Sequence, residues 1–329
     1  DYNPLSASMI VSEPRTGSIL ALANVPDFDP NFYNKSDLAF QRNRALSDLY
    51  EPGSTFKIVA VSGCMNDGIV SPSDIIDCSV STIQKGSKRL RLPGDHHPLG
   101  KISVKQVVQK SSNRGAAQLG IKLGSQRLYD YCRAFGFGQK TGFGIGGERK
   151  GILHHPKNWD GLTITRLPMG HAVSATAMQV HSAMSTVANG GVLMKPKFIN
   201  RVFDEEGKTV TPFNAKPVRR VVSTRVAKSL TDMLVSVVSS QGTARKARVK
   251  GFDVAGKTGT TQKLVNGKYS RTHHVGSFVG FIIIRMLSTP DITSLSLSLS
   301  LSIYIYVHIF IHMYLHINIY ICVYVDMYI

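Results

Sequence analysis

The sequence predicts an α+β domain in which one antiparallel sheet unites strands from distant parts of the chain and helices lie between them in sequence. Residues 7–24 have the pattern of two strands joined by a turn at residues 14–17. Much later, residues 252–261 and 275–284 form a second predicted strand pair, joined by a polar turn around residues 266–267. The segments between the two pairs have helical patterns.

The first of these helices covers residues 54–66, directly after a Pro-Gly pair, and is apolar nearly all round, so we expect it to be buried. Residues 104–110 and 114–123 predict two helical pieces on either side of a Ser-Ser-Asn turn. A helix rich in small residues is predicted for residues 172–188 and stops at an Asn-Gly-Gly sequence. A further helix covers residues 223–239, capped by its first serine or threonine.

Composition is that of a globular protein, with 329 residues and 43% apolar residues, enough to bury a large core. The net charge of +18 favours anionic partners such as nucleic acid, a membrane surface or a carboxylate-bearing polymer. The densest Lys/Arg run, residues 85–91, is short and interrupted, so we expect no nucleic-acid partner. The four cysteines have neither CxxC nor metal-ligand spacing, which predicts no disulfide scaffold and no zinc site.

From about residue 286 the sequence changes character. Residues 294–302 repeat Ser-Leu, and residues 303–325 alternate Ile, Tyr, Val and His, as a dinucleotide DNA repeat would if translated in one frame. We therefore interpret residues 285–329 as a low-complexity tail, translated simple-sequence DNA. Its uncharged β-prone alternation is an aggregation hazard.

Two other interpretations of the tail remain open. Residues 303–325 are long enough to span a bilayer, but several polar residues would be costly there. His308, His312 and His316 are spaced at i, i+4 and i+8, as metal ligands on one helix face would be, although the alternation opposes a helix.

The first chemical motif is Ser54-x-x-Lys57, at the start of the predicted buried helix. A serine hydroxyl needs a base to become a nucleophile, and positions i and i+3 share a helix face, so Lys57 can approach Ser54. Burial would lower the lysine pKa and leave part of it neutral. Free backbone N–H groups of the first turn could receive an oxyanion. The motif is short, and an N-capping serine beside an unrelated lysine is the alternative.

The second motif is Ser111-Ser112-Asn113, in the turn between two helical pieces. A hydroxyl can relay a proton and an amide can hold a peptide carbonyl. An ordinary helix–helix link would use the same residue types.

The third motif is Lys257-Thr258-Gly259-Thr260 on a predicted strand, where glycine permits close approach to the backbone. Lys257 and the two threonine hydroxyls could hold a terminal carboxylate. Residues 140–142 also spell Lys-Thr-Gly, but they lie in a Gly-rich stretch without a strand pattern, so we predict a loop without chemistry.

Taken together and in this order, the three motifs resemble those of penicillin-binding proteins and serine β-lactamases. The flanking residues resemble the class B transpeptidases of the division and elongation type, and the resemblance covers nearly all of residues 7–284. These flanks are residues 42–45, 50–57, 109–113, 147–149, 170–174 continuing to 188–191, and 254–260.

The resemblance implies a serine β-lactamase/DD-peptidase-like fold, an antiparallel sheet flanked by helices with a helical subdomain. It implies that Ser54 attacks the penultimate D-Ala carbonyl of a peptidoglycan stem peptide, with Lys57 as base and Ser111 as proton shuttle. Asn113 would hold the substrate backbone, and the backbone N–H groups of Ser54 and Thr260 would form the oxyanion hole. The terminal carboxylate would lie on Lys257, Thr258, Gly259 and Thr260.

The same resemblance implies β-lactams as ligands, no metal or cofactor, and a glycosyltransferase partner for a full-length relative. It places the enzyme at the extracytoplasmic (periplasmic) face of the cytoplasmic membrane, or in an organelle if the gene is eukaryotic. A D,D-carboxypeptidase or β-lactamase-type hydrolase and a catalytically dead truncated relic are the alternatives.

Two departures from the family are expected. The membrane anchor and N-terminal pedestal domain are absent from this chain. The transpeptidase domain, residues 1–284, also lacks the family's last strand and C-terminal helix, whose place the tail takes. We therefore expect an unpaired strand edge there.

Overall fold

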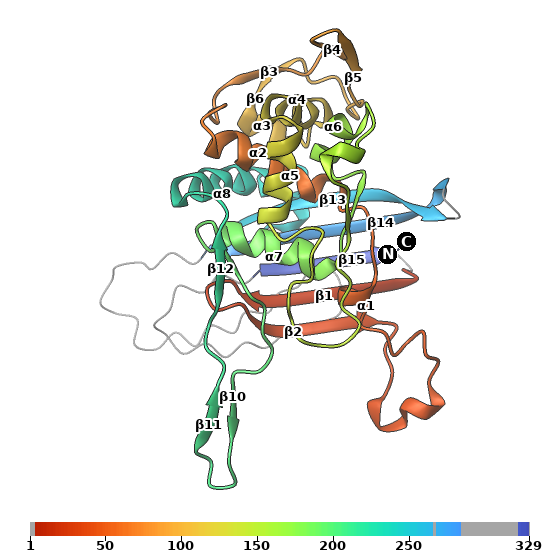
Figure 1. Cartoon of the computed structure of the whole chain (residues 1–329), viewed down its shortest axis with the longest axis vertical. Coiled ribbons are helices and arrows are strands. Elements are labelled where there is room, and N and C mark those ends of the chain that lie inside the picture. The colour runs from red at the N-terminus through yellow and green to blue at the C-terminus, as the bar shows by residue number, and fades with distance from the viewer. Residues whose placement is uncertain (1–3, 266–267, 284–321, 329) are drawn as a thin grey trace.

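The core of the fold is a five-stranded antiparallel sheet in the order β13-β14-β15-β1-β2 (Figure 1). In this computed structural model, residues 4–265, 268–283 and 322–328 are described. Both strand pairs predicted from sequence are present, and β13 and β14 are longer than expected, so the α+β prediction is confirmed. The strands are β1 (Ser6–Glu13), β2 (Ser18–Val25), β13 (Asp253–Val265), β14 (Lys268–Ile283) and β15 (Cys322–Tyr328).

The expectation of an unpaired strand edge is wrong for the described part of the chain. Strand β15 lies between β14 and β1 and pairs antiparallel with both, from Phe281↔Cys322 to Val275↔Tyr328 on one side. On the other side its register runs from Ser12↔Cys322 to Ser6↔Tyr328. Ladder hydrogen bonds use only backbone groups, so an extended, β-prone segment can fill the position without a family sequence. The interpretations of residues 285–321, including the three histidines and most of the bilayer span, lie outside the described residues.

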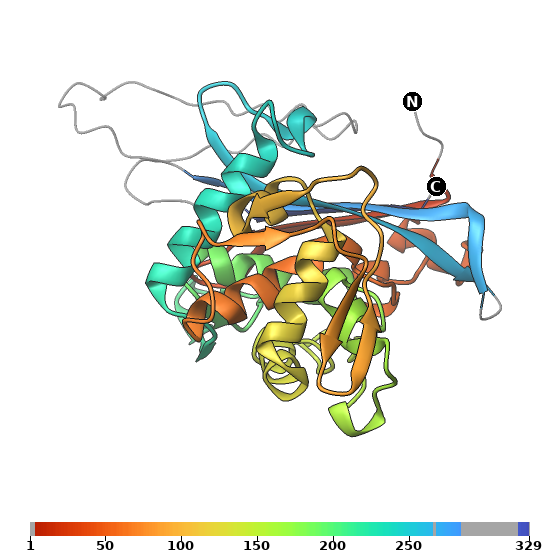
Figure 2. The same ribbon diagram turned by 90° about the horizontal axis from the view of Figure 1, so that it is seen from above.

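Helices from the middle of the chain cover one face of this sheet (Figure 2). Helix α7 (Ala177–Ala188) packs against β1, β14 and β15, and α8 (Thr224–Val238) packs along β13. Helix α2 (Lys57–Asn66) contacts α4, α5 and α8 and is buried along nearly its whole length. Apolar residues on every side of α2 explain this position, because a helix without a polar face is stable only when all its faces are buried.

A helical subdomain lies at one end of the sheet, at the top of Figure 1. Two of its helices start at side-chain caps: Ser103 and Gln106 form a capping box for α3, and Ser112 accepts a hydrogen bond from Gly115 N in α4. The subdomain contains α3 (Val104–Gln109), α4 (Asn113–Leu123), α5 (Ser125–Ala134), α6 (Thr163–Arg166) and the strand pairs β3 (Ile75–Asp77) with β6 (Lys101–Ser103) and β4 (Thr82–Lys85) with β5 (Lys88–Arg91).

The predicted start of the small-residue helix at residue 172 is wrong. Helix α7 begins at Ala177, because Thr176 and Gln179 form a capping box there. The preceding Val173–Ser174 is strand β8, paired with β7 (Ile152–Leu153), and Ala172 has a positive φ of 60°. Alanine favours a helix but Val173, Ser174 and Thr176 do so less, and the capping box decides where the helix starts.

The remaining elements are short, and the β10–β11 hairpin projects away from the body of the molecule. No helix in the described ranges combines the length and the apolar character that a bilayer span requires. These elements are α1 (Arg44–Ser47), β9 (Val192–Met194) paired with β12 (Pro217–Arg220), β10 (Arg201–Phe203) paired with β11 (Thr209–Pro212), and the 3₁₀ helices η1 (Pro30–Lys35), η2 (Gly53–Phe56), η3 (Pro156–Asn158), η4 (Leu167–Met169) and η5 (Arg245–Ala247).

The central position of β15 generates a prediction about stability. Deleting residues 322–329 removes the ladder partners of both β14 and β1 and leaves two facing strand edges unpaired, so we expect a lower thermal midpoint and faster aggregation. Differential scanning calorimetry and light scattering measure the two effects, with deletion of Ile329 alone as the control. Equal midpoints for the two deletions would contradict the role of β15.

Candidate active site

Two buried lysines from distant segments meet at one serine hydroxyl. Lys57 Nζ, from the first turn of α2, lies 3.1 Å from Ser111 Oγ, and Lys257 Nζ, from β13, lies 2.9 Å from the same oxygen. Lys57 Nζ also donates to Ser111 O at 2.5 Å and to Asn113 Oδ1 at 2.8 Å. Four side chains from the three sequence motifs are therefore joined directly by hydrogen bonds.

Burial makes it difficult to keep both lysines charged. Lys57 is 1% exposed and Lys257 is 0% exposed. Burial lowers the pKa of Lys57 well below its ordinary value, the neighbouring Lys257 charge lowers it further, and Asp95 partly opposes this. Burial lowers the pKa of Lys257 to about 7. A neutral Lys57 can accept the Ser111 hydroxyl proton while a charged Lys257 donates to Ser111 Oγ, an arrangement in which a hydroxyl can relay a proton between two amines.

Ser111 reaches this position because the chain turns sharply between α3 and α4. Its φ is 59°, in the left-handed region that non-glycine residues rarely adopt. Hydrogen bonds from Ser111 N to Val108 O at 3.2 Å and from Ser112 N to Val107 O at 3.0 Å fasten the turn to α3. A strained residue held in this way at a cluster of reactive groups is typical of a functional site.

Asp95 is a site residue that the sequence analysis missed. Its carboxylate accepts hydrogen bonds from Ser112 Oγ at 2.8 Å, from Asn113 N and from Arg114 N at 3.2 Å. It therefore caps α4 and fixes the turn that presents Ser111. Its negative charge is also the one that opposes the lowering of the Lys57 pKa. Its position in a Pro-Gly-Asp turn, 16 residues before Ser111, gave only a loop signal, because no sequence spacing reveals a cap supplied by another segment.

Ser54 lies in η2, and this turn packs directly on β13. Gly53 has a φ of 55°, and a Cβ on it would lie 2.6 Å from Thr261 Cγ2. A Cβ on Gly259 would lie 2.9 Å from Pro52 O and 2.6 Å from Ser277 Oγ. Both glycines therefore let the turn approach the strand. At Gly259, atoms of Pro52 and Ser277 occupy the space that a side chain would need.

The remaining predicted residues of the third motif share strand β13. Thr260 is exposed and Thr258 is half-buried, with its Oγ1 3.3 Å from Thr243 Oγ1. Lys257 Nζ also donates to Thr258 O at 3.1 Å. The two threonine hydroxyls thus lie on the strand beside the Ser54 turn, while the buried lysine points to Ser111.

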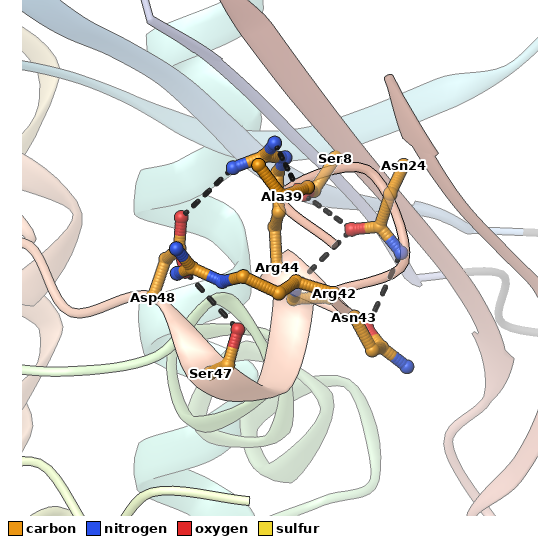
Figure 3. Close-up of polar contacts among 9 residues, drawn as sticks. Ser8, Asn24, Ala39, Arg42, Asn43, Arg44, Ser47 and Asp48 are labelled. Carbon is orange, nitrogen blue, oxygen red and sulfur yellow. Dashed lines mark hydrogen bonds and ion pairs between the residues drawn. The ribbon is translucent and has the colours of Figure 1, made fainter. Parts of the chain in front are cut away.

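The segment before Ser54 is fastened to the sheet by a polar network (Figure 3). Asn24 Oδ1 accepts hydrogen bonds from Ser8 Oγ at 2.8 Å and from Ala45 N at 3.1 Å, and Asn24 Nδ2 donates to Asn43 Oδ1 at 3.2 Å. Arg42 and Arg44 pair with Asp48 beside this amide. The Arg-Asn-Arg-Ala sequence therefore orients the chain that leads to the nucleophile.

The second Lys-Thr-Gly sequence is a loop, as predicted. Thr141 N and Thr141 Oγ1 each donate to Glu148 Oε1 at 2.5 Å, and Gly142 N donates to Glu148 Oε2 at 3.3 Å. These contacts explain Glu148 as a residue that ties the Gly-rich loop together.

Within the described residues, His, Cys, Asp and Glu side chains form no cluster of three or more that could hold a metal ion. Burial raises the pKa of the Cys64 thiol to about 12 and also raises the pKa values of Cys78 and Cys132. Buried thiols of this kind are poor nucleophiles. The three described cysteines therefore offer no reactive thiol.

The low pKa of Lys257 generates a prediction about stability and pH. The folded pKa is about 7 and the ordinary value is 10.5, so between these values the unfolded chain binds more protons and stability rises with pH. Lys257→Met removes this contribution. Between pH 7 and 10 its free energy of unfolding should therefore rise by roughly 2–4 kcal/mol less than that of the wild type. Urea unfolding at several pH values measures the difference. The control Lys140→Met changes an exposed lysine of the Gly-rich loop. If the free energy of unfolding of Lys257→Met varied with pH in parallel with that of Lys140→Met, the low pKa of Lys257 would be contradicted.

Comparisons with known proteins agree with this geometry. The chain is 35% identical over 284 residues to stage V sporulation protein D of Bacillus subtilis, covering 85% of this chain and 43% of that protein. It is 30% identical over 282 residues to the probable peptidoglycan D,D-transpeptidase PenA of Neisseria gonorrhoeae, covering 85% of this chain and 46% of PenA. The chain thus spans somewhat less than half the length of these relatives.

Solved structures of penicillin-binding proteins have the same fold. Penicillin-binding protein 3 of Mycobacterium tuberculosis, complexed with aztreonam, superposes with a TM-score of 0.78 at 29% identity, covering 98% of this chain and 66% of that chain. The transpeptidase domain of penicillin-binding protein 3 from Burkholderia pseudomallei superposes with a TM-score of 0.73 at 26% identity, covering 98% and 80%.

The family description "Penicillin binding protein transpeptidase domain" matches residues 7–285. This match takes in the β1–β2 strands, the three motifs and β14, and it agrees with the site described above. The chain therefore belongs to the penicillin-binding protein transpeptidase family.

Proposed function

We propose that this chain is a peptidoglycan D,D-transpeptidase domain that works through an acyl-enzyme on Ser54. The observation that carries the proposal is the convergence of two buried lysines on Ser111 Oγ beside the turn that holds Ser54. A nucleophile, a base of lowered pKa and a proton relay are the parts that acyl transfer to serine requires. The names of relatives such as PenA and the FtsI protein of Buchnera aphidicola support the same reaction.

In the first half of the proposed reaction, neutral Lys57 takes the proton of Ser54, and Ser54 Oγ attacks the penultimate D-Ala carbonyl. The new bond joins Ser54 Oγ to that carbonyl carbon, and the amide bond to the terminal D-Ala breaks. The proton passes from Lys57 through Ser111 to the leaving amine, which departs as D-Ala. Backbone N–H groups of Ser54 and Thr260 stabilise the oxyanion, and Asn113 holds the substrate backbone.

The terminal carboxylate is proposed to bind along β13. Lys257 is fully buried and its Nζ points to Ser111 Oγ, so it attracts the carboxylate by its charge rather than by direct contact. Thr258 and Thr260 are the more exposed groups of the motif and supply the direct hydrogen bonds, beside Gly259. In the second half of the reaction, the amine of another stem peptide attacks the acyl carbon and regenerates Ser54.

The same site would react with β-lactams, because their strained ring amide places a carbonyl and a carboxylate as the stem peptide does. Complexes of the Mycobacterium tuberculosis relative with aztreonam and with ampicillin support this extension. We further propose that the domain acts at the extracytoplasmic face of the cytoplasmic membrane, and that a longer protein of this type works with a glycosyltransferase.

The proposal is tested by incubating the purified chain with fluorescent penicillin and measuring covalent labelling after denaturing electrophoresis. We expect a stable adduct on the wild type and none on Ser54→Ala, because this variant lacks the hydroxyl proposed as the nucleophile. Lys257→Ala should label roughly 100-fold more slowly, because it loses the charge on the relay, whereas Lys140→Ala in the other Lys-Thr-Gly sequence should label normally.

The other outcomes separate the alternatives. If the label decays rapidly and hydrolysed drug is released, the protein is a hydrolase and the transpeptidase proposal is wrong. Absence of labelling on a folded wild type, equal to Ser54→Ala, would indicate a relic without activity. Ser87→Ala, an exposed serine in the β4–β5 turn, controls for nonspecific effects of serine replacement.

A further inference from the structure

Glu51 lies three residues before the nucleophile and has no part in the proposed proton transfers. Its residue is 9% exposed, yet its carboxylate contacts three groups from two other segments. Glu51 Oε2 lies 2.7 Å from His171 Nδ1, and Glu51 Oε1 accepts a hydrogen bond from Ala172 N at 3.0 Å. Tyr269 OH donates to the same carboxylate, at 3.0 and 3.2 Å from its two oxygens. A buried carboxylate with this many donors is held in one orientation.

The backbone around Glu51 is fastened to the same two segments. Tyr50 N and O pair with Ala175 O and N at 3.1 and 2.9 Å, and Gly53 N donates to Gly170 O at 3.1 Å. Thr261 Oγ1 on β13 donates to Glu51 O at 3.0 Å. The chain that carries Ser54 is therefore clamped between the 170–175 segment and the β13–β14 hairpin.

This close approach depends on unusual backbone conformations. Gly170 has a φ of 85°, and a Cβ on it would lie 2.1 Å from Gly53 O. Ala172, whose N–H bonds to Glu51, has a positive φ of 60° although it is not glycine. Such a conformation persists only where neighbouring contacts enforce it, and the Glu51 carboxylate supplies one of these contacts.

The charges of the cluster are consistent with an ionised carboxylate. Burial raises the pKa of Glu51. The hydrogen bond and charge of His171, together with the hydrogen bonds from Ala172 N and Tyr269 OH, outweigh this effect and bring the pKa below its ordinary value. Burial, together with the Glu51 charge, raises the pKa of Tyr269 to about 12, so this hydroxyl remains a donor at neutral pH. The rings of His171 and Tyr269 also meet edge to face, with centroids 6.3 Å apart.

We propose that Glu51, His171 and Tyr269 form a positioning lock that fixes the Ser54 turn against β13 in the orientation needed for acylation. The predicted effect on the acylation rate rests on the proposed function, whereas the predicted effect on the structure of the turn rests only on the contacts above. Glu51 acts through the turn rather than on the substrate. Gln at position 51 keeps the size of the side chain but cannot pair all its donors, because one of its terminal atoms is itself a donor.

The kinetic test measures fluorescent-penicillin acylation at increasing drug concentrations, which separates the limiting acylation rate from the half-saturating concentration. Glu51→Gln should lower the limiting rate about 10- to 100-fold, because misplacing a nucleophile costs that much, while the half-saturating concentration stays nearly constant. Tyr269→Phe should lower it by a smaller factor. The double variant should be no slower than Glu51→Gln, since the tyrosine acts through the carboxylate. Glu206→Gln, an exposed glutamate in the β10–β11 turn, is the control.

The structural test is amide hydrogen exchange of the same variants without any ligand. The lock predicts faster exchange of the N–H groups of Gly53 and Ala172 in Glu51→Gln, with unchanged exchange in α8. Wild-type exchange and a wild-type limiting rate in Glu51→Gln would overturn the lock. Additive effects in the double variant would show that Tyr269 acts independently, which also contradicts it.

The two tests keep the lock separate from the proposed function. A wild type that does not acylate removes the proposed function, and hydrogen exchange then decides the lock alone. A wild type that acylates together with an equally fast Glu51→Gln removes the lock and leaves the function. A variant that merely loses stability lowers the thermal midpoint and the labelled fraction, but not the limiting rate of the folded molecules.

Discussion

The burial of two lysine amines on either side of one hydroxyl is the constraint to which the rest of the site is arranged. Lys57 and Lys257 come from a helix and a strand that are 200 residues apart, and both are almost completely removed from water. Burial lowers the pKa values of both amines, and the charge of Lys257 lowers that of Lys57 further, so the fold favours a neutral amine at this position. A neutral amine is what the proposed base requires.

The architecture around this pair can be understood as the means of holding it. Helix α2 is buried along nearly its whole length, which brings Lys57 into the interior. Strand β13 brings Lys257 from the sheet, and the strained Ser111 turn, capped by Asp95, supplies the shared hydroxyl. Burying charge weakens a fold unless polar partners compensate, and here those partners are Ser111 and Asn113, to which we propose roles in the reaction.

Glycine has a related role at the boundary between turn and sheet. Gly53 and Gly259 allow η2 to approach β13 more closely than side chains would permit, and Gly170 allows the loop behind it to approach Gly53. Cross-links from Thr261 and Glu51 then fasten the turn at that distance. The turn that carries Ser54 is thus placed by steric fit and by polar contacts together.

The sequence by itself determined most of the secondary-structure elements and the candidate site residues. Hydrophobic pattern and turn residues predicted both strand pairs and the buried helix, because these features depend on neighbours in the chain. They also predicted an α8 cap at Ser223 or Thr224, and the structure uses Ser223. The three motifs named Lys57, Asn113 and Lys257, which the structure joins to Ser111 in one hydrogen-bonded cluster. The lack of a strand pattern excluded the other Lys-Thr-Gly sequence. Only the tertiary structure decided that Asp95 caps α4, that Glu51 joins His171 and Tyr269, and that β15 fills the sheet. Each of these depends on contacts between segments far apart in sequence, and local spacing carries no record of which distant partner a cap, a carboxylate or a strand edge will meet.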